Sequence, residues 1–308
     1  LVAGPIVRPW ELIPRFLNPE PLDDSRFGRA LTLFLRGLVK KSAADFLAMS
    51  LVDRVFDLPS HYSTLEVMAA IYGYALQIYG DFSGYTDMAL GVAALLGIDL
   101  PQNFDHPYAS RSLREFWRRW HISLSSWLRD YLYISLGGSR GGFWSTQRNL
   151  FLTMLLGGLW HGASWNFVIW GAIHGAVLVT GRLWEEHGPK AANPDAPWRA
   201  VVGTLVTFHT VALAWIFFRA ETFSGAIALI AQVGRGWGGG AANLSPAVVA
   251  VLVAGFALHL MPQRLRSFGE GLMVRSPALV QGALALAGLY LARSLTGGST
   301  QPFIYFQF

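Results

Sequence analysis

The sequence contains no cysteine, which excludes disulfides, thiol nucleophiles and thiolate metal sites. Any covalent intermediate on the protein would therefore have to form on another kind of side chain. Charge is also scarce, because Asp, Glu, Lys and Arg make up only 14% of the 308 residues. Soluble domains carry about 25% charged residues, so this chain is too apolar for a surface that faces water.

Basic residues interleaved with aromatics in a soluble context are also lacking, so nothing indicates nucleic-acid binding. The formal net charge is only +5. The basic residues gather near the ends of apolar runs, which is typical of contact with anionic lipid headgroups. We therefore expect membrane lipid, and no nucleic acid, among the partners of the chain.

Apolar residues are abundant instead: 53% of the chain is hydrophobic, with 12 Trp and 20 Phe. This composition predicts a polytopic membrane protein. Runs of near membrane-crossing length lie at roughly 64–80, 88–98, 149–161, 164–183, 201–218, 246–261 and 277–293. Several are shorter than the ~20 residues of a straight crossing helix, so we expect some spans to be tilted, broken or buried in the bundle.

The first 56 residues differ from these runs. Residues 4–28 are rich in proline and charge, which predicts a loop with short helical turns. In residues 29–56, one helical face is apolar and predicts an amphipathic segment in the membrane interface; that face is formed by Leu31, Phe34, Leu35 and Leu38. The pair Lys40 and Lys41 favours the cytoplasmic side.

Two carboxylates, Asp81 and Asp87, interrupt an apolar stretch. A carboxylate that faced lipid would raise the free energy of the folded protein, so we expect both to face protein or water. They either form interhelical ion pairs with basic residues or bind substrate. Six residues apart on one helix, they differ by about 240° in direction, so they do not form an acid pair for hydrolysis.

The most polar stretch is 101–135. Ser112 followed by Glu115 is a capping-box pattern, so a helix is expected to begin near Leu113. On a continuous helix His121 lies at the edge of an aromatic arc and faces the interior, whereas arginines such as Arg118 face the other side. These arginines either anchor lipid headgroups or dock a phosphate-bearing donor or acidic carrier protein.

The glycine-rich turn 137–142 lacks the lysine-threonine ending of a phosphate-binding loop, so we reject a nucleotide site there.

The next histidine, His161, lies about 13 residues after Arg148. That distance is about 20 Å of helix, short of a ~30 Å hydrocarbon core. If Arg148 marks one interface, His161 lies within the membrane thickness.

An ionisable residue at that depth is a functional candidate, although a lone buried histidine is often only a structural hydrogen-bonding residue. Gly157, Gly158 and Gly162 leave space beside His161, either for close helix packing or for a ligand. A buried neutral imidazole can accept a proton from a hydroxyl or carry an acyl group. His121, His161 and His174 could in principle bind a metal, but no acidic ligand stands at a suitable spacing, so we expect no metal. We expect His174 to pack in the protein or to form a hydrogen bond.

Five segments together resemble the membrane-bound O-acyltransferase family, and within it the bacterial alginate O-acetylation branch. They are GPIVRP (4–9), QIYGDFSGYTDMA (77–89), FWRRWHISLSSWLRDYLYI (116–134), GGLWHGASWNFVIWGAIHG (157–175) and PFIYFQF (302–308). The resemblance implies an all-α, polytopic transmembrane helical bundle with interfacial amphipathic helices around a central funnel. Residues 1–308 would form a single membrane domain that lacks the family's N-terminal helices.

The resemblance also implies roles for residues. His161 would be the catalytic residue, as base or acyl relay, and His121 the second functional histidine that orients it or completes the proton path. We take Trp160, Trp165, Asp81, Asp87 and Arg118 as candidate substrate-binding residues. No cofactor is expected to be bound, and acetyl-CoA is the expected donor. The expected setting is the bacterial inner membrane, with a periplasmic acetyltransferase or acyl-relay partner and a polysaccharide acceptor.

Other readings remain open. The same fold could transfer D-alanine to teichoic acid precursors, or acetylate peptidoglycan or cellulose. A membrane transporter is the non-enzyme alternative, but the chain shows no internal inverted repeat, and its polar residues gather in two histidine segments. Labelled-acetyl transfer separates these readings, because a transporter moves its substrate unchanged.

Overall fold

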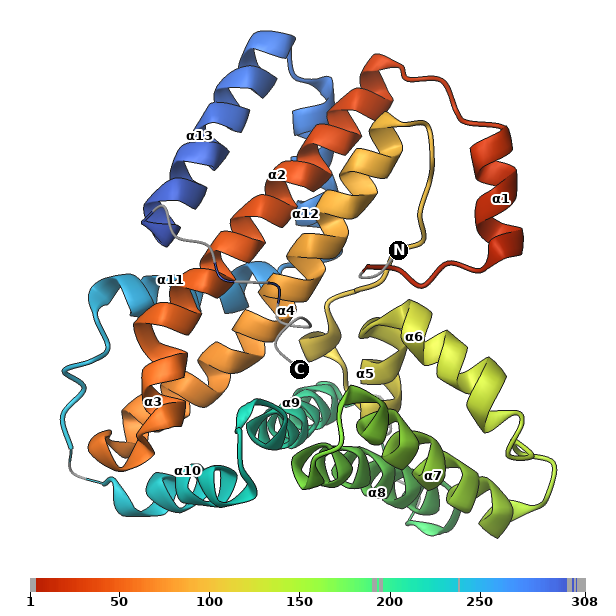
Figure 1. Ribbon diagram of the computed structural model, residues 1–308, viewed down its shortest axis with the longest axis vertical. Helices are drawn as coiled ribbons and strands as arrows, with labels where there is room; N and C mark the ends of the chain where they lie inside the picture. Colours follow the sequence, from red (N-terminus) through yellow and green to blue (C-terminus); the bar gives the residue numbers. More distant parts are fainter. Residues whose placement is uncertain are drawn as a thin grey trace. The chain divides into compact units, whose positions relative to one another are not determined.

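A computed structural model describes residues 4–189, 193, 196–237, 239–297, 301 and 303 (Figure 1). These residues form thirteen α-helices with short π and 3₁₀ turns and, within the described part of the chain, no strand. The all-α fold class is therefore confirmed. The chain divides into two compact units. One comprises 1–51, 75–103 and 245–307, and the other comprises 52–74, 104–244 and residue 308.

The first unit contains the amino-terminal and carboxy-terminal helices and most of the long helix α4. Its helices are α1 (Pro9–Leu17), α2 (Asp24–Leu47), the later part of α4 (Thr64–Leu95), α11 (Pro246–His259), α12 (Gln263–Arg275) and α13 (Ala278–Thr296). Within it, α12 and α13 both pack on α2.

The second unit contains the central helices and both histidine segments. Its helices are α3 (Asp53–Asp57), the start of α4, α5 (Leu113–Arg119), α6 (Ile122–Trp127), α7 (Phe143–His161), α8 (Trp165–His187), α9 (Pro197–Arg219) and α10 (Phe223–Arg235). Short 3₁₀ turns occur at Pro59–His61 and Pro107–Ala109, and a π-helix at Leu128–Tyr133; a further π-helix, Ala48–Val52, lies at the boundary of the units.

In the described residues, three helices are long and apolar enough to cross a membrane: α8, α9 and α13. They confirm the spans predicted at 164–183, 201–218 and 277–293. The run at 246–261 becomes α11, which forms with α12 a pair bent by 98°. The runs at 64–80 and 88–98 are not two spans, because α4 is one continuous helix of 32 residues through the polar interruption.

The amphipathic segment predicted at 29–56 is helical, formed by α2, the π-helix Ala48–Val52 and α3, and small residues outside the predicted apolar face are the ones that pack inside the protein. Phe34 is exposed, whereas the small residues Gly28, Ala30, Gly37 and Ala44 are buried. A Cβ atom on Gly37 would lie 2.4 Å from the carbonyl oxygen of Gly84 on α4. The two backbones therefore touch, and packing of small residues determined the buried face.

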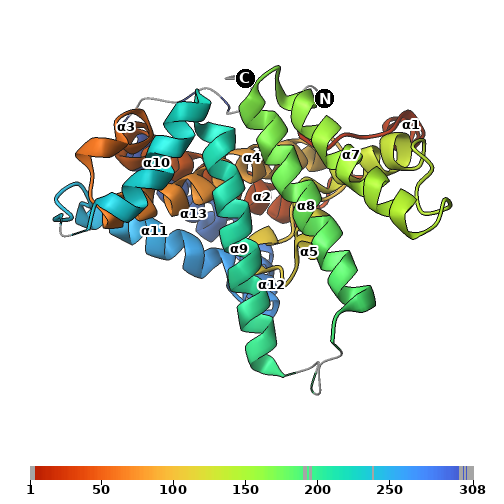
Figure 2. The ribbon, with the colours of Figure 1, turned by 90° about the horizontal axis from the view of Figure 1, so that it is seen from below.

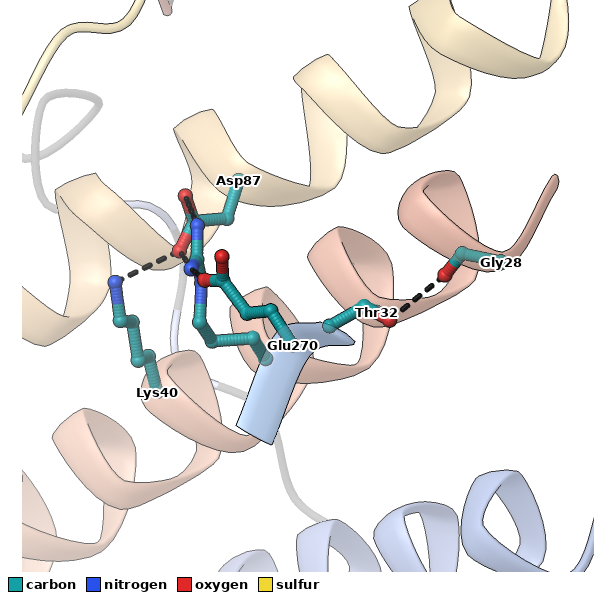
Figure 3. Close-up of polar contacts among 6 residues, drawn as sticks. Gly28, Thr32, Lys40, Asp87 and Glu270 are labelled. Atoms are coloured by element: carbon teal, nitrogen blue, oxygen red, sulfur yellow. Dashed lines mark hydrogen bonds and ion pairs between the residues drawn. The ribbon is translucent and has the colours of Figure 1, made fainter. Parts of the chain in front are cut away.

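Charged side chains join the same two helices (Figure 3). The carboxylate of Asp87 accepts two hydrogen bonds from the guanidinium of Arg36, at 2.9 and 3.0 Å, and one from Lys40 at 2.7 Å. Arg36 also contacts Glu270 of α12. Six residues earlier on α4, Asp81 pairs with Lys41 at 2.5 Å. The polar interruption of α4 thus forms interhelical ion pairs.

Replacing Asp87 by Asn tests the contribution of these ion pairs. The amide removes the negative charge between two partly exposed cations, so we expect D87N to lower the free energy of unfolding by about 1–2 kcal/mol. The apparent melting temperature of the detergent-solubilised protein measures this. Asp130→Asn is the control, because Asp130 pairs with the exposed Arg129 and such a pair contributes little. Equal melting temperatures for D87N and D130N would contradict the prediction.

In the second unit, α7 and α8 form a tightly packed antiparallel hairpin, with α9 beside α8 (Figure 2). A Cβ on Gly158 would lie 2.3 Å from the carbonyl oxygen of Phe167, and one on Gly171 would lie 2.5 Å from that of Met154. Glycine is therefore required on both helices where they cross. This packing, and not space for a ligand, explains Gly158.

Replacing Gly158 by Ala forces α7 and α8 apart, so we expect a loss of about 1–3 kcal/mol in stability. Gly181→Ala lies on the same hairpin, where a Cβ meets nothing within 4 Å. It should be neutral or slightly stabilising, because alanine favours the helix. Heating followed by size-exclusion chromatography compares the two variants. A Gly158→Ala protein as heat-resistant as Gly181→Ala would show that the crossing is looser than described.

Candidate active site

His161 is the last residue of α7, at the turn of the hairpin. The helix ends at Gly162, and Ser164 begins α8 by accepting a hydrogen bond from the amide of Asn166 (3.3 Å). The Asn166 side chain donates in turn to the carbonyl of Ala220, at the end of α9 (2.6 Å). The sequence WHGAS thus specifies a tight reversal that is held against α9, and the imidazole lies at its start.

Aromatic rings surround the His161 imidazole, which is half-buried. Ring centroids lie 5.1 Å away for Trp160, 5.2 Å for Trp170, 5.0 Å for Phe218 and 6.0 Å for Phe167. Trp160 is 60% exposed, so the predicted site residue forms an outer wall of this aromatic cage. Trp165 is 77% exposed, which is typical of an aromatic side chain at a membrane interface.

The second histidine lies where the predicted continuous helix breaks. The Ser112 hydroxyl accepts a hydrogen bond from the Glu115 amide (3.2 Å), as the capping box predicts, and α5 begins at Leu113. The helix already ends at Arg119, however, and His121 has a left-handed backbone with φ of 43°. The continuous helix was therefore a wrong prediction.

The inward position of His121 is nevertheless correct, because only 3% of the residue is exposed. Its Nδ1 lies 3.5 Å from the Ser123 hydroxyl. The ring centroid of Phe104 lies 6.3 Å from that of His121. Two histidines forty residues apart in sequence thus belong to the same unit, one at a helix break and the other at a hairpin turn.

Behind this pair, α5 and α8 contribute an aromatic core around His174. The residue is fully buried, and its Nδ1 accepts a hydrogen bond from the indole of Trp117 (3.2 Å). The acceptor role of Nδ1 puts the proton of the neutral ring on Nε2. The ring centroids of His174 and Trp170 lie 4.8 Å apart. Among the described residues, neither the Nε2 of His174 nor the indole N–H of Trp170 has a hydrogen-bond partner.

No group of three His, Asp or Glu side chains in the described ranges lies close enough to hold a metal ion. His161 and His174 each contact Trp170, whose indole lies between them. The chemistry available here is therefore that of imidazoles and N–H donors in an aromatic surrounding: accepting a proton from a hydroxyl, passing it on, or carrying an acyl group.

The remaining predicted residues are not gathered around His161. Asp81 and Asp87 belong to the first unit, where their carboxylates bind the basic residues of α2. Those contacts favour the interhelical role over substrate binding. Arg118 belongs to the second unit but lies on the exposed side of α5, next to Trp117 in sequence.

Arg118 lines a cavity of about 470 Å³ together with Arg114, Arg182, Glu185 and Glu186. Arg114 pairs with Glu185 at 2.9 Å, which joins α5 to the end of α8. The sequence alone did not identify Arg182, because it lies 64 residues from Arg118 and in no motif. Its position among basic residues at the end of a predicted span was the only available signal.

Comparison with known proteins identifies the family. The membrane-bound O-acyltransferase family profile matches residues 1–218. The chain is 48% identical over 223 residues to the probable alginate O-acetylase AlgI of Pseudomonas aeruginosa, covering 72% of this chain and 41% of that protein. It is 39% identical over 232 residues to the peptidoglycan O-acetyltransferase of Helicobacter pylori (75% and 44%).

It is also 32% identical over 184 residues to the teichoic acid D-alanyltransferase of Bacillus subtilis, covering 55% of this chain and 45% of that protein. The chain spans less than half the length of each of these relatives. The family profile covers both histidine segments, the α7–α8 hairpin and α9. On this evidence the chain belongs to the membrane-bound O-acyltransferase family.

Proposed function

We propose that the chain supplies the catalytic histidines of an O-acetyltransferase that moves an acetyl group from a cytoplasmic thioester, acetyl-CoA, to a hydroxyl of an extracellular polysaccharide such as alginate. The observation that carries the proposal is the aromatic cage around the His161 imidazole at the hairpin turn, in the same unit that buries His121. The alginate O-acetylase names of the relatives support acetyl as the group and alginate as the acceptor.

In the proposed reaction, His161 accepts the proton of the acceptor hydroxyl while the hydroxyl oxygen attacks the thioester carbonyl. The new C–O bond forms, the C–S bond breaks, and the thiolate leaves with the proton that the imidazole gives up. His121 holds the His161 ring or passes the proton. The aromatic cage limits water near the thioester, which favours transfer to the acceptor over hydrolysis.

The orientation of the hairpin supports a cytoplasmic donor side. Phe143 and His187 are in ring contact at 5.2 Å, so the start of α7 and the end of α8 lie together, at the end opposite His161. Arg140, Arg148, Arg182 and Arg199 gather in sequence around this end. By the positive-inside rule it faces the cytoplasm, which puts the His161 turn toward the outer side.

This orientation fits the bacterial inner membrane as the location. A periplasmic acyl-relay protein would receive the acetyl group there, or the polysaccharide would receive it directly. The alternative is D-alanyl transfer, which the match to the teichoic acid D-alanyltransferase favours. That match is lower in identity and shorter than the matches to the acetylases.

Replacing His161 by Ala tests the function. We expect a loss of at least about 100-fold in acetyl transfer, because a general base contributes roughly 10²- to 10⁴-fold. The measurement is the acetate that mild alkali releases from the cell's exopolysaccharide, in cells that contain equal amounts of each protein. His187→Ala is the control, since His187 lies exposed at the other end of the hairpin. Unchanged release of acetate in H161A would refute the proposal. If alkali releases D-alanine from the wild type and not from H161A, the transferred group is D-alanyl and not acetyl.

Replacing His121 requires a residue that accepts the left-handed backbone. Asn does so more readily than Ala, so H121N removes the imidazole with little strain. We expect H121N to lose transfer activity by about 10-fold or more, while its melting temperature stays near that of the wild type. If H121N melts early and a stabilised H121N regains activity, His121 is only a structural residue.

A further inference from the structure

Two of the five segments that carry the family resemblance contact each other within the first unit, and the proposed reaction uses neither. One is 77–89 on α4, and the other is 302–308. The ring of Phe303 stacks on that of Tyr85, with centroids 4.7 Å apart, and meets the ring of Phe82 at 5.6 Å and a steep angle. Phe303 is only 6% exposed, so it is buried against α4.

The residue two positions before Phe303 is held through its backbone. The ammonium group of Lys41, on α2, donates a hydrogen bond to the carbonyl oxygen of Gln301 at 3.1 Å. It also pairs with Asp45 at 2.6 Å and with Asp81 at 2.5 Å, and each of these carboxylate side chains is 4% exposed. An ammonium group has three N–H donors, so the carbonyl of Gln301 accepts from the third. Without that carbonyl, one donor of a largely buried ammonium would lose its acceptor, which is unfavourable.

The contacts come from one of two ion-pair clusters that join α2 to α4. Asp81 and Tyr85 are four residues apart on α4, so they share a face of that helix. Asp87 lies about 240° around α4 from Asp81 and pairs with Lys40 instead (Figure 3). Two neighbouring lysines of α2 thus reach different faces of α4, and the one that binds residues 301–303 is Lys41.

These contacts have the two components of a peptide-binding site. Every residue has a backbone carbonyl, so the hydrogen bond from Lys41 does not depend on which side chain stands at position 301. The ring contacts, in contrast, require an aromatic side chain at position 303. Peptide-binding sites combine main-chain hydrogen bonds, which give affinity, with side-chain contacts, which give specificity. Three buried charged groups are also a costly way to fix a loop, because each must be taken out of water.

We propose that the faces of α2 and α4 around Lys41 form a peptide-binding site whose ligand is the segment of this chain that contains Gln301 and Phe303. Lys41 binds the carbonyl oxygen of residue 301, and Tyr85 and Phe82 bind the aromatic side chain of residue 303. The bound segment bridges α2 and α4, and it can leave the site and return to it. The site is independent of the proposed acyl transfer, and its tests measure binding alone.

Binding of the segment as a separate peptide tests the site. The natural-length protein without residues 301–308 is titrated in detergent against a labelled peptide of residues 298–308, and fluorescence anisotropy gives the Kd. We expect saturable binding. Phe303→Ala in the peptide should raise the Kd at least about tenfold, because the burial of an aromatic ring is lost. Gln301→Ala should leave the Kd unchanged, because residue 301 is bound through its backbone.

A matched pair of lysines separates recognition from stability. Lys41→Gln and Lys40→Gln each remove an ion pair between α2 and α4, so a general loosening of the two helices would affect peptide binding equally. We expect K41Q to raise the Kd at least about tenfold, because a hydrogen bond from a charged group to the peptide is lost. K40Q should leave the Kd as it is.

A second measurement uses the intact chain and does not depend on how the shortened protein folds. The photoreactive residue p-benzoylphenylalanine replaces Phe303, and ultraviolet light then links it to its neighbours. Mass spectrometry should find it joined to residues 81–88 of the same chain. The yield of this link should fall in K41Q and stay unchanged in K40Q.

Three results would overturn the proposal. Absence of saturable binding by a monodisperse shortened protein, or equal Kd values for the natural and the Phe303→Ala peptides, shows that Phe303 is ordinary core packing. Equal effects of K41Q and K40Q on the Kd and on the photolink show that Lys41 only stabilises the helices. Photolinks between two chains show that the site binds the segment of a second copy and not its own.

Discussion

The contact on which the candidate site depends is the close crossing of α7 and α8 at Gly158 and Gly171. With no side chains between them, the backbones pack so closely that the turn after His161 can reverse within three residues. Trp170, one residue before Gly171, is thereby held against the imidazole. A bulkier residue at either glycine would separate the histidine from the aromatic side chains that surround it.

Polar groups are few in this chain, and the structure uses them in two ways. In the first unit, Asp87 and Asp81 neutralise the basic residues of α2, so charge holds two long helices together. In the second unit, neutral imidazole and indole groups lie in the core, where an unpaired charge would be costly. Charged side chains also line an open cavity between α5 and the end of α8: Arg114, Arg118, Arg182, Glu185 and Glu186.

Hydrophobic run length and local capping predicted much of this fold. The spans formed by α8, α9 and α13 and the start of α5 at Leu113 follow from patterns within a few residues. The helix break at His121 could not be predicted, because it depends on burial among Phe104 and other distant rings. The buried face of α2 was also missed, since glycine packing carries no hydrophobic signal. Arg182 comes near Arg118 only because α5 packs on α8 in the folded chain.

The central claim is that His121 and His161 act as one unit in acyl transfer. The most direct measurement is a double-mutant cycle on the rate of acetyl transfer, with H121N, H161A and the combined variant present at equal levels in the membrane. We predict that the combined variant is no slower than H161A alone, because the second histidine acts only through the first. Losses that multiply in the combined variant would show two independent contributions and contradict the account.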